Sequence, residues 1–257
     1  MPAQSATIDQ LIEIASNSAI ADYSWNRRGL APKGYITGIA VTYARVYCKL
    51  ISGDDSAKEM AKAKTRDENT DCLAWYNPEF LNHGMDNSTD GADTLRHLFV
   101  LLTGLGMRES SGRYCEGRDR SASNTIAETT EAGLFQTSYN ARFASPLLPD
   151  LFVKYANSTD FIEIFKVGVR CSAANLENFG EGQGKEFQRL TKACPAFAVE
   201  FAAVGLRNVR THWGPVNRKE AELRDDCDLM LKDIQKAVDD SNLCPLVLLD
   251  QTPNWRR

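Results

Sequence analysis

The strongest constraint on the fold of this chain is the spacing of its apolar residues, which repeat at three- and four-residue steps. This spacing places apolar side chains along one face of a helix, and that face has to be buried. The repeating segments are residues 8–15, 36–50, 95–105, 197–204 and 223–238. Alternating patterns typical of strands are scarce. The sequence therefore predicts a mainly α fold.

Turn-forming residues divide the chain into two parts. Residues 64–91 are polar and carry Asn-Pro, His-Gly and Asp-Gly signals, which are typical of a long surface connection. This connection separates a helical part, residues 1–90, from residues 91–257. No internal repeat and no flexible linker splits the chain. We therefore expect one domain, in which residues 1–90 form an N-terminal helical extension packed on the core.

Length and charge exclude several classes of protein. A chain of 257 residues can bury a substantial core. The net charge of -4, with scattered Lys and Arg, gives no sign of a nucleic-acid or anionic-membrane partner. No apolar run is long enough to span a membrane. The first residues lack the pattern of a signal peptide, so either this is a mature form with an added Met or export uses another route.

Seven cysteines are more than a typical cytosolic protein of this size needs. They form no CxxC pair and only three histidines accompany them, so we expect no metal site and no cofactor. Up to three disulfides would suit a protein that acts in an oxidising compartment. The alternative is that several of the cysteines are small, buried thiols. The candidate disulfides that would close the shortest loops are Cys227–Cys244 and Cys171–Cys194.

The chemistry is predicted to lie in residues 109–140. Glu109 ends an apolar helix that begins near Asp93, and Ser110, Ser111 and Gly112 follow it. Burial of a carboxyl at a helix end raises its pKa toward the value that a general acid needs near neutral pH. Gly112 suits the left-handed residue that ends a helix. A solvated glutamate in a last turn is the alternative interpretation.

A second motif, Gly-Leu-Phe-Gln at residues 133–136, follows on the far side of a polar loop. The ordered pair of Glu-Ser-Ser-Gly and Gly-Leu-Phe-Gln resembles the lysozyme-like superfamily of lytic transglycosylases and goose-type lysozymes. Phe135 stands where that family usually has Met. The resemblance implies a lysozyme-like helical domain with a small β-loop element. The polar residues 113–136 allow a short three-stranded element but do not demand one.

The resemblance also implies roles for single residues. Glu109 would be the general acid/base that protonates the leaving glycosidic oxygen, Ser111 would lie beside it, and Gln136 would line the sugar cleft. The family's later motif of Tyr-Asn-Ala-Gly type has no counterpart at the expected place. Tyr139 comes too early to match it but remains a candidate sugar contact. Trp213, in Thr-His-Trp-Gly-Pro, is either a stacking platform for a sugar ring or part of the core.

A second carboxylate would decide the mechanism. Inverting and retaining glycosidases both use two carboxyl groups, which lie farther apart in the inverting enzymes. The resemblance to lytic transglycosylases implies that a single carboxyl group can be enough, because a hydroxyl of the substrate itself attacks the sugar carbon. The candidates are Glu116, Asp119, Glu128 and Glu131. We rank Glu128 first and Glu131 second, and a solvated loop position is the alternative for each.

These expectations favour a glycosidase that cleaves the β-1,4 bond between N-acetylmuramic acid and N-acetylglucosamine in peptidoglycan. Its site of action would be outside the cytoplasm, in a periplasm or the wall of a target cell. Delivery by a lysis system or an injection machine would imply a dedicated immunity protein as a partner beside the glycan strand. The alternatives are a chitin or chitosan glycosidase, and a non-catalytic domain that binds glycan or a partner protein.

Overall fold

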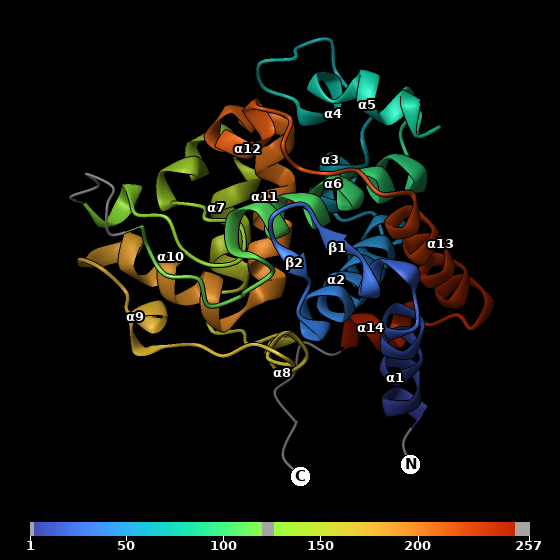
Figure 1. Ribbon diagram of the computed structural model, residues 1–257, viewed down its shortest axis with the longest axis horizontal. Helices are drawn as coiled ribbons and strands as arrows, with labels where there is room; N and C mark the ends of the chain where they lie inside the picture. The colour runs from blue at the N-terminus through green and yellow to red at the C-terminus, as the bar shows by residue number, and fades with distance from the viewer. Residues whose placement is uncertain (1–2, 120–125, 250–257) are drawn as a thin grey trace.

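The computed structural model describes residues 3–119 and 126–249, and its elements are mainly α-helical, as predicted (Figure 1). The longer helices are α1 (Ala3–Ser16), α2 (Lys33–Ile51), α3 (Asp55–Ala61), α6 (Ala92–Ser110), α7 (Leu147–Lys154), α10 (Gly182–Ala193), α11 (Pro195–Asn208) and α13 (Asp225–Asp240). The shorter ones are α4 (Cys72–Trp75), α5 (Asn77–Asn82), α8 (Ile162–Phe165), α9 (Ala173–Leu176), α12 (Gly214–Asn217) and α14 (Cys244–Leu249). Four 3-10 turns complete the helical elements: η1 (Ala19–Asp22), η2 (Ala127–Thr129), η3 (Tyr139–Ala144) and η4 (Arg210–His212). No helix of the described part is long and apolar enough to cross a membrane.

Helix α2 lies at the centre of the fold and packs against α1, α6, α8, α11 and α13. Every residue from Gly34 to Lys49 is buried, because apolar side chains occupy all its faces rather than one stripe. Gly34 lies so close to carbonyl oxygens at the C-terminal end of α8 and just after it that a side chain has no room there. The expected extension, residues 1–90, therefore supplies the central helix of the core, and residue 90 is not a boundary in the structure.

Buried charges fix α2 against its neighbours. Lys49 lies 2.7 Å from the carboxylate of Glu200 on α11, and the Tyr155 hydroxyl donates to the same carboxylate at 2.7 Å. Arg45, one turn earlier, pairs with Asp160 at 2.7 Å. A buried charge that loses its partner is strongly destabilising, so these pairs restrict the helices to one arrangement.

The polar segment 64–91 is not the loose surface connection that its composition indicates. It folds into α4 and α5, and the buried carboxylate of Asp71 accepts hydrogen bonds from the backbone amides of Thr65 and Leu73. The same carboxylate pairs with Arg207 on α11 at 2.9 Å. Polar contacts of this kind hold a segment in place without any apolar periodicity, so no pattern in the sequence indicates them.

The strand content is smaller than expected and lies elsewhere. Strands β1 (Ser24–Trp25) and β2 (Gly29–Leu30) pair antiparallel as a short hairpin before α2. The described residues between 113 and 136 contain only one end of an isolated bridge, between Ala132 and Thr137, so they do not form the three-stranded element that the sequence allowed. A side chain of α10, that of Gln188, donates to the backbone of this loop at the Ala127 carbonyl.

Two disulfides join Cys48 to Cys244 and Cys115 to Cys171. Both pairs named from the shortest loops are therefore wrong. Cys227 is buried on α13, where its thiol bonds to Thr103, and Cys194 is buried beside Ser158. Nearness in sequence did not predict nearness in space because rigid helices separate the members of each short loop.

Candidate active site

The last turns of α6 are held by close packing that glycines allow. A side chain at Gly104 would collide with the backbone of Glu222, and one at Gly106 would collide with the Tyr35 hydroxyl. That hydroxyl donates to the Thr103 carbonyl at 2.7 Å, within α6. The C-terminal end of α6 is therefore fixed between α2 and the segment before α13, and Glu109 is fixed with it.

The helix ends as its sequence indicates. Ser111 and Gly112 both adopt left-handed backbone angles, with φ of 54° and 72°. The amide of Gly112 donates back to the Gly106 carbonyl at 3.2 Å, which is the hydrogen bond that closes such a helix end. Ser110 turns its hydroxyl onto the same carbonyl at 3.0 Å. Ser111 is thus the half-exposed hydroxyl residue that leaves the helix after Glu109.

The carboxyl of Glu109 is half-buried, and its surroundings favour the protonated form. Burial is the largest cause and raises its pKa to about 8, with a further contribution from the negative charge of Glu131. The charges of Arg28, Arg218 and Arg108 act in the opposite direction and do not cancel this effect. Glu109 therefore carries its proton at neutral pH.

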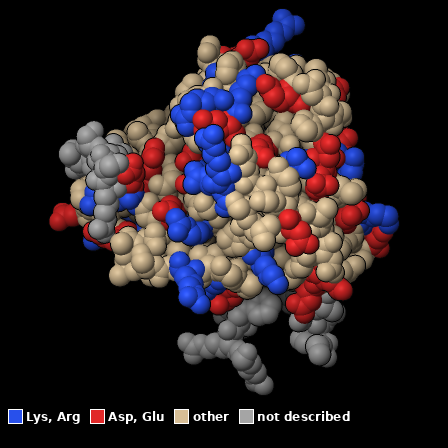
Figure 2. Space-filling model, viewed as in Figure 1, with Lys and Arg blue, Asp and Glu red and all other residues tan. Residues whose placement is uncertain are grey.

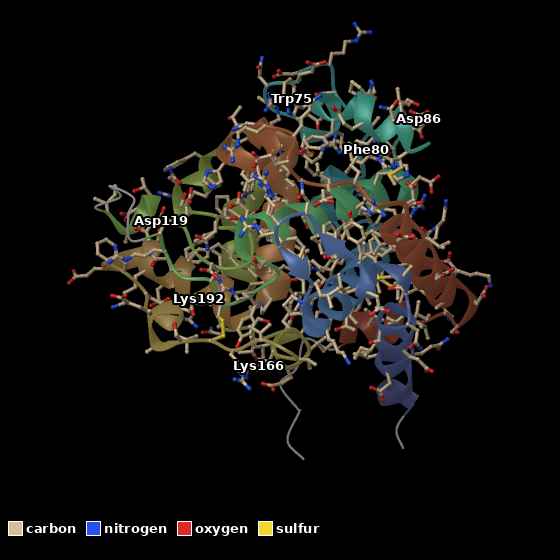
Figure 3. The ribbon with its side chains drawn as sticks, viewed as in Figure 1. Trp75, Phe80, Asp86, Asp119, Lys166 and Lys192 are labelled. Carbon is tan, nitrogen blue, oxygen red and sulfur yellow. A yellow bond between two sulfur atoms is a disulfide. The ribbon has the colours of Figure 1, made fainter. Side chains whose placement is uncertain are left out.

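Among the described acids of the polar loop, Glu131 has the largest electrostatic effect on the pKa of Glu109. Burial also raises the pKa of Glu131, and the charge of Asp119 on the same loop adds to this (Figure 3). Glu128 lies instead on η2, whose backbone packs against Gly184 at the start of α10. The electrostatics of the site therefore favour Glu131 over Glu128, which reverses the order expected from the sequence.

Helix α10 supports the polar loop through hydrogen bonds from its side chains. The amide of Gln188 bonds to the Ala127 carbonyl at 3.3 Å and to both backbone groups of Phe179. Lys192, one turn later, donates to the carbonyl of Glu177 at 2.6 Å (Figure 3). On the other side, the disulfide at Cys115 ties the start of the loop to the segment before α9. The loop is anchored at both of these points.

The Gly-Leu-Phe-Gln motif forms a tight turn held by the segment after α11. The indole of Trp213 donates to the Phe135 carbonyl at 2.9 Å, and the ring of His212 bonds to the backbone of Gln136. Gln136 has a φ of 46°, and its side-chain amide donates to the Gly133 carbonyl at 3.0 Å. The Thr-His-Trp-Gly-Pro segment therefore lies against this motif.

Neither aromatic candidate presents its ring to solvent. Trp213 is only 1% exposed and packs on Gly205 of α11, so of the two roles considered it has the core one. Tyr139 is 6% exposed, its hydroxyl donates to Gln183, and its ring packs on Phe152 at 5.2 Å. The prediction that Tyr139 contacts sugar directly is therefore corrected. Tyr139 supports the site from the core.

Sequence reasoning missed a cluster of charges beside Glu109, which we call the arginine cluster: Arg28, Arg108, Arg218 and Glu220. Glu220 pairs with Arg108 at 3.0 Å and with Arg218 at 2.9 Å, and Arg28 donates to the carbonyl of Arg108. These hydrogen bonds and charges lower the pKa of Glu220 to about 2. Figure 2 shows Lys and Arg gathered in the middle of this face, between α12 and the β hairpin. No sequence signal joins three segments so far apart.

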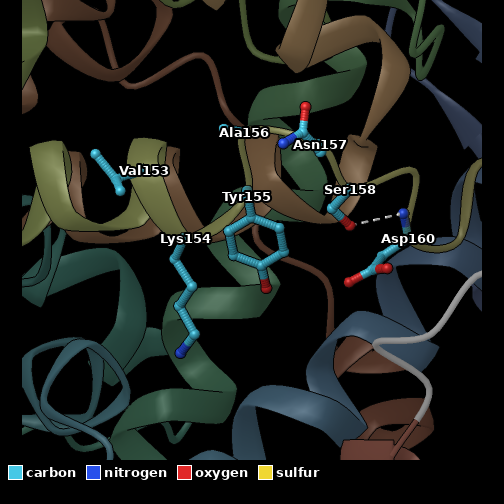
Figure 4. Close-up of a pocket in the computed structure, with 7 residues that line it drawn as sticks. All are labelled: Val153, Lys154, Tyr155, Ala156, Asn157, Ser158 and Asp160. Atoms are coloured by element: carbon cyan, nitrogen blue, oxygen red, sulfur yellow. Dashed lines mark hydrogen bonds between the residues drawn. The ribbon is translucent and has the colours of Figure 1, made fainter.

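A separate pocket of about 250 Å³ lies at the end of α7, between Val153 and Asp160 (Figure 4). Its lining includes Tyr155 and Asp160, which belong to the buried charge pairs around α2. The pocket shares no residue with the groups around Glu109. It therefore belongs to the framework of the core rather than to the candidate site.

We predict that the Cys115–Cys171 disulfide stabilises the polar loop rather than the core. Replacing both cysteines by serine should lower the free energy of unfolding by about 2–5 kcal/mol. Amide hydrogen exchange should accelerate in residues 113–119 and 126–137, whereas α2 should remain protected. The matched control replaces Cys48 and Cys244, and it should leave exchange in the loop unchanged. Equal exchange of the loop in both double variants would contradict this role.

The chain matches no family model, no curated protein and no solved structure. What the site does must therefore be inferred from its own geometry and electrostatics. These are a protonated carboxyl at the end of α6, a second carboxylate on an anchored loop and a cluster of arginines beside the first.

Proposed function

We propose that this chain is a peptidoglycan glycosidase that cleaves the β-1,4 bond between N-acetylmuramic acid and N-acetylglucosamine, with Glu109 as its general acid. The observation that carries the proposal is the half-buried Glu109 carboxyl, whose pKa burial raises to about 8. A carboxyl that keeps its proton at neutral pH can give it to the leaving oxygen as the glycosidic bond breaks.

The second carboxylate in this proposal is Glu131. Its negative charge contributes to the raised pKa of Glu109, and burial raises the pKa of Glu131 as well. A neighbouring pair of carboxyl groups suits the acid and base of glycoside hydrolysis. Glu109 would protonate the glycosidic oxygen, and water would add to the sugar carbon while its proton passes to a carboxylate.

Two residues would line the cleft beside these acids. Ser111 leaves the helix half-exposed next to Glu109, and Gln136 lies on the turn that Trp213 and His212 hold. The buried ring of Trp213 would keep this turn rigid rather than bind sugar. A rigid turn matters because a displacement of about 1 Å at a catalytic centre can cost about a hundredfold in rate.

The proposed place of action is outside the cytoplasm, in a periplasm or the wall of a target cell. Two disulfides support this, since such bonds persist in oxidising compartments. A producing cell would then need protection from the enzyme, and a dedicated immunity protein that covers the cleft would supply it. Both statements depend on the glycosidase activity.

We predict that Glu109→Gln lowers the rate of release of soluble fragments from purified peptidoglycan by about a hundredfold or more, because the amide cannot donate the proton. Glu131→Gln should lower it as well. Glu128→Gln is the matched control and should keep most of the activity. A Glu109→Gln variant with undiminished activity would exclude the proposed mechanism.

Mass spectrometry of the fragments distinguishes the chemical outcomes. Reducing ends would show hydrolysis, whereas anhydro-muramic ends would show transglycosylation by a hydroxyl of the substrate. Cleavage of chitin oligomers with none of peptidoglycan would replace the proposed substrate by chitin. Glycan binding by wild-type protein that releases no fragment would leave a binding domain and refute the enzyme.

We predict a pH profile of kcat/KM that stays high up to about pH 8. The sign follows from the raised pKa of Glu109, since the proton donor is active below its pKa and is lost as the pH rises through it. On the acid side, the rate should fall as Glu131 becomes protonated. This fall should come at a higher pH than for an ordinary glutamate, because burial raises the pKa of Glu131. A rate that declines steadily from pH 5 upward would contradict both assignments.

A further inference from the structure

The arginine cluster is accessible at one end and structural at the other. The side chain of Arg108 is 20% exposed, and it connects Glu220 to the last turn of α6. The side chain of Arg218 is 60% exposed, and Arg28 on the β hairpin is exposed as well. Arg28 donates to the carbonyl of Arg108, the residue that precedes Glu109. The two exposed guanidinium groups therefore border the proton donor from two different segments.

The charges in this cluster do not balance. Among the described residues, Glu220 is the only carboxylate that pairs with these three arginines, which leaves two positive charges over. Glu222 lies in the same region, but its carboxylate accepts from the Tyr23 hydroxyl at 2.8 Å and from the Asn26 amide at 2.9 Å. Since Glu109 is protonated at neutral pH, it adds no negative charge there. An excess of guanidinium charge beside a reaction centre favours an anionic ligand.

We infer that Arg28 and Arg218 form a carboxylate-binding subsite beside Glu109, which selects glycan strands carrying anionic peptide stems over neutral glycans. The inference rests on the proposed function and names its substrate class more closely. Guanidinium groups bind carboxylates through paired, charge-assisted hydrogen bonds. The peptide stems of peptidoglycan carry free carboxylates, whereas chitin has none. Arg218 reaches Glu220 with two of its nitrogens, at 2.9 and 3.0 Å, so its geometry already suits a carboxylate.

A purely structural clasp is the competing explanation of the same contacts. In that case the arginines would only tie the β hairpin and the segment after α12 to α6. Removal of Glu220 separates the two explanations. Glu220→Gln breaks the clasp, but it leaves the arginines charged and without their carboxylate partner. A clasp would then lose binding of every ligand, whereas a carboxylate subsite would keep or gain affinity for an anionic one.

The test measures binding rather than turnover, in the Glu109→Gln background, so that ligands survive. Isothermal titration calorimetry would use three ligands: a peptidoglycan fragment with free stem carboxylates, the same fragment with those carboxylates amidated, and chitotetraose. Arg28→Gln and Arg218→Gln should each weaken binding of the first ligand by about tenfold or more. Binding of the two ligands without carboxylates should be unchanged. Arg189→Gln is the matched control, because Arg189 forms an exposed ion pair with Glu186 on α10.

Three results would overturn the subsite. The first is an equal loss of affinity for all three ligands in the arginine variants, and the second is no loss for the anionic one. The third is Glu220→Gln weakening the anionic ligand as much as Arg218→Gln does. The proposed function fails separately, when wild-type protein releases no fragment from peptidoglycan. Selective binding of the anionic fragment would then still stand without catalysis.

Discussion

The close approach of α6 to Tyr35 and to the backbone of Glu222 is the constraint on which the site depends. Gly104 and Gly106 make it possible, because any side chain at either position would collide with those groups. The approach fixes the end of α6 that carries Glu109, and burial is the main reason that the pKa of Glu109 is raised. The packing of the core thus sets the position of the proposed acid.

What could be predicted from the sequence was local. Apolar residues at helical spacing indicated α1, α2, α6, α11 and α13, and Gly112 indicated the left-handed end of α6. A half-buried glutamate followed from its place at the end of an apolar helix. Each of these depends on neighbours within a turn or two of helix, where spacing and backbone preference act directly.

What could not be predicted depended on contacts between distant segments. The disulfide partners lie 196 and 56 residues apart, and the Asp71–Arg207 pair that orders residues 64–91 joins two helical regions. In the site, the preference for Glu131 and the arginine cluster arise in the same way. Trp213 illustrates the limit well, since its indole reaches the Phe135 carbonyl only once α11 is packed. The sequence around Trp213 is equally compatible with an exposed ring and with a buried one.

The central claim is that Glu109 keeps its proton at neutral pH, and the most direct measurement is a carboxyl NMR titration. Glutamate labelled with 13C at its carboxyl carbon would be incorporated, and the Glu109 signal would be assigned by its loss in Glu109→Gln. We expect a midpoint at about pH 8 in the wild-type chain and a lower one in Glu131→Gln, where the neighbouring charge is gone. A midpoint at about pH 4.3, the value of an ordinary glutamate, would contradict the claim.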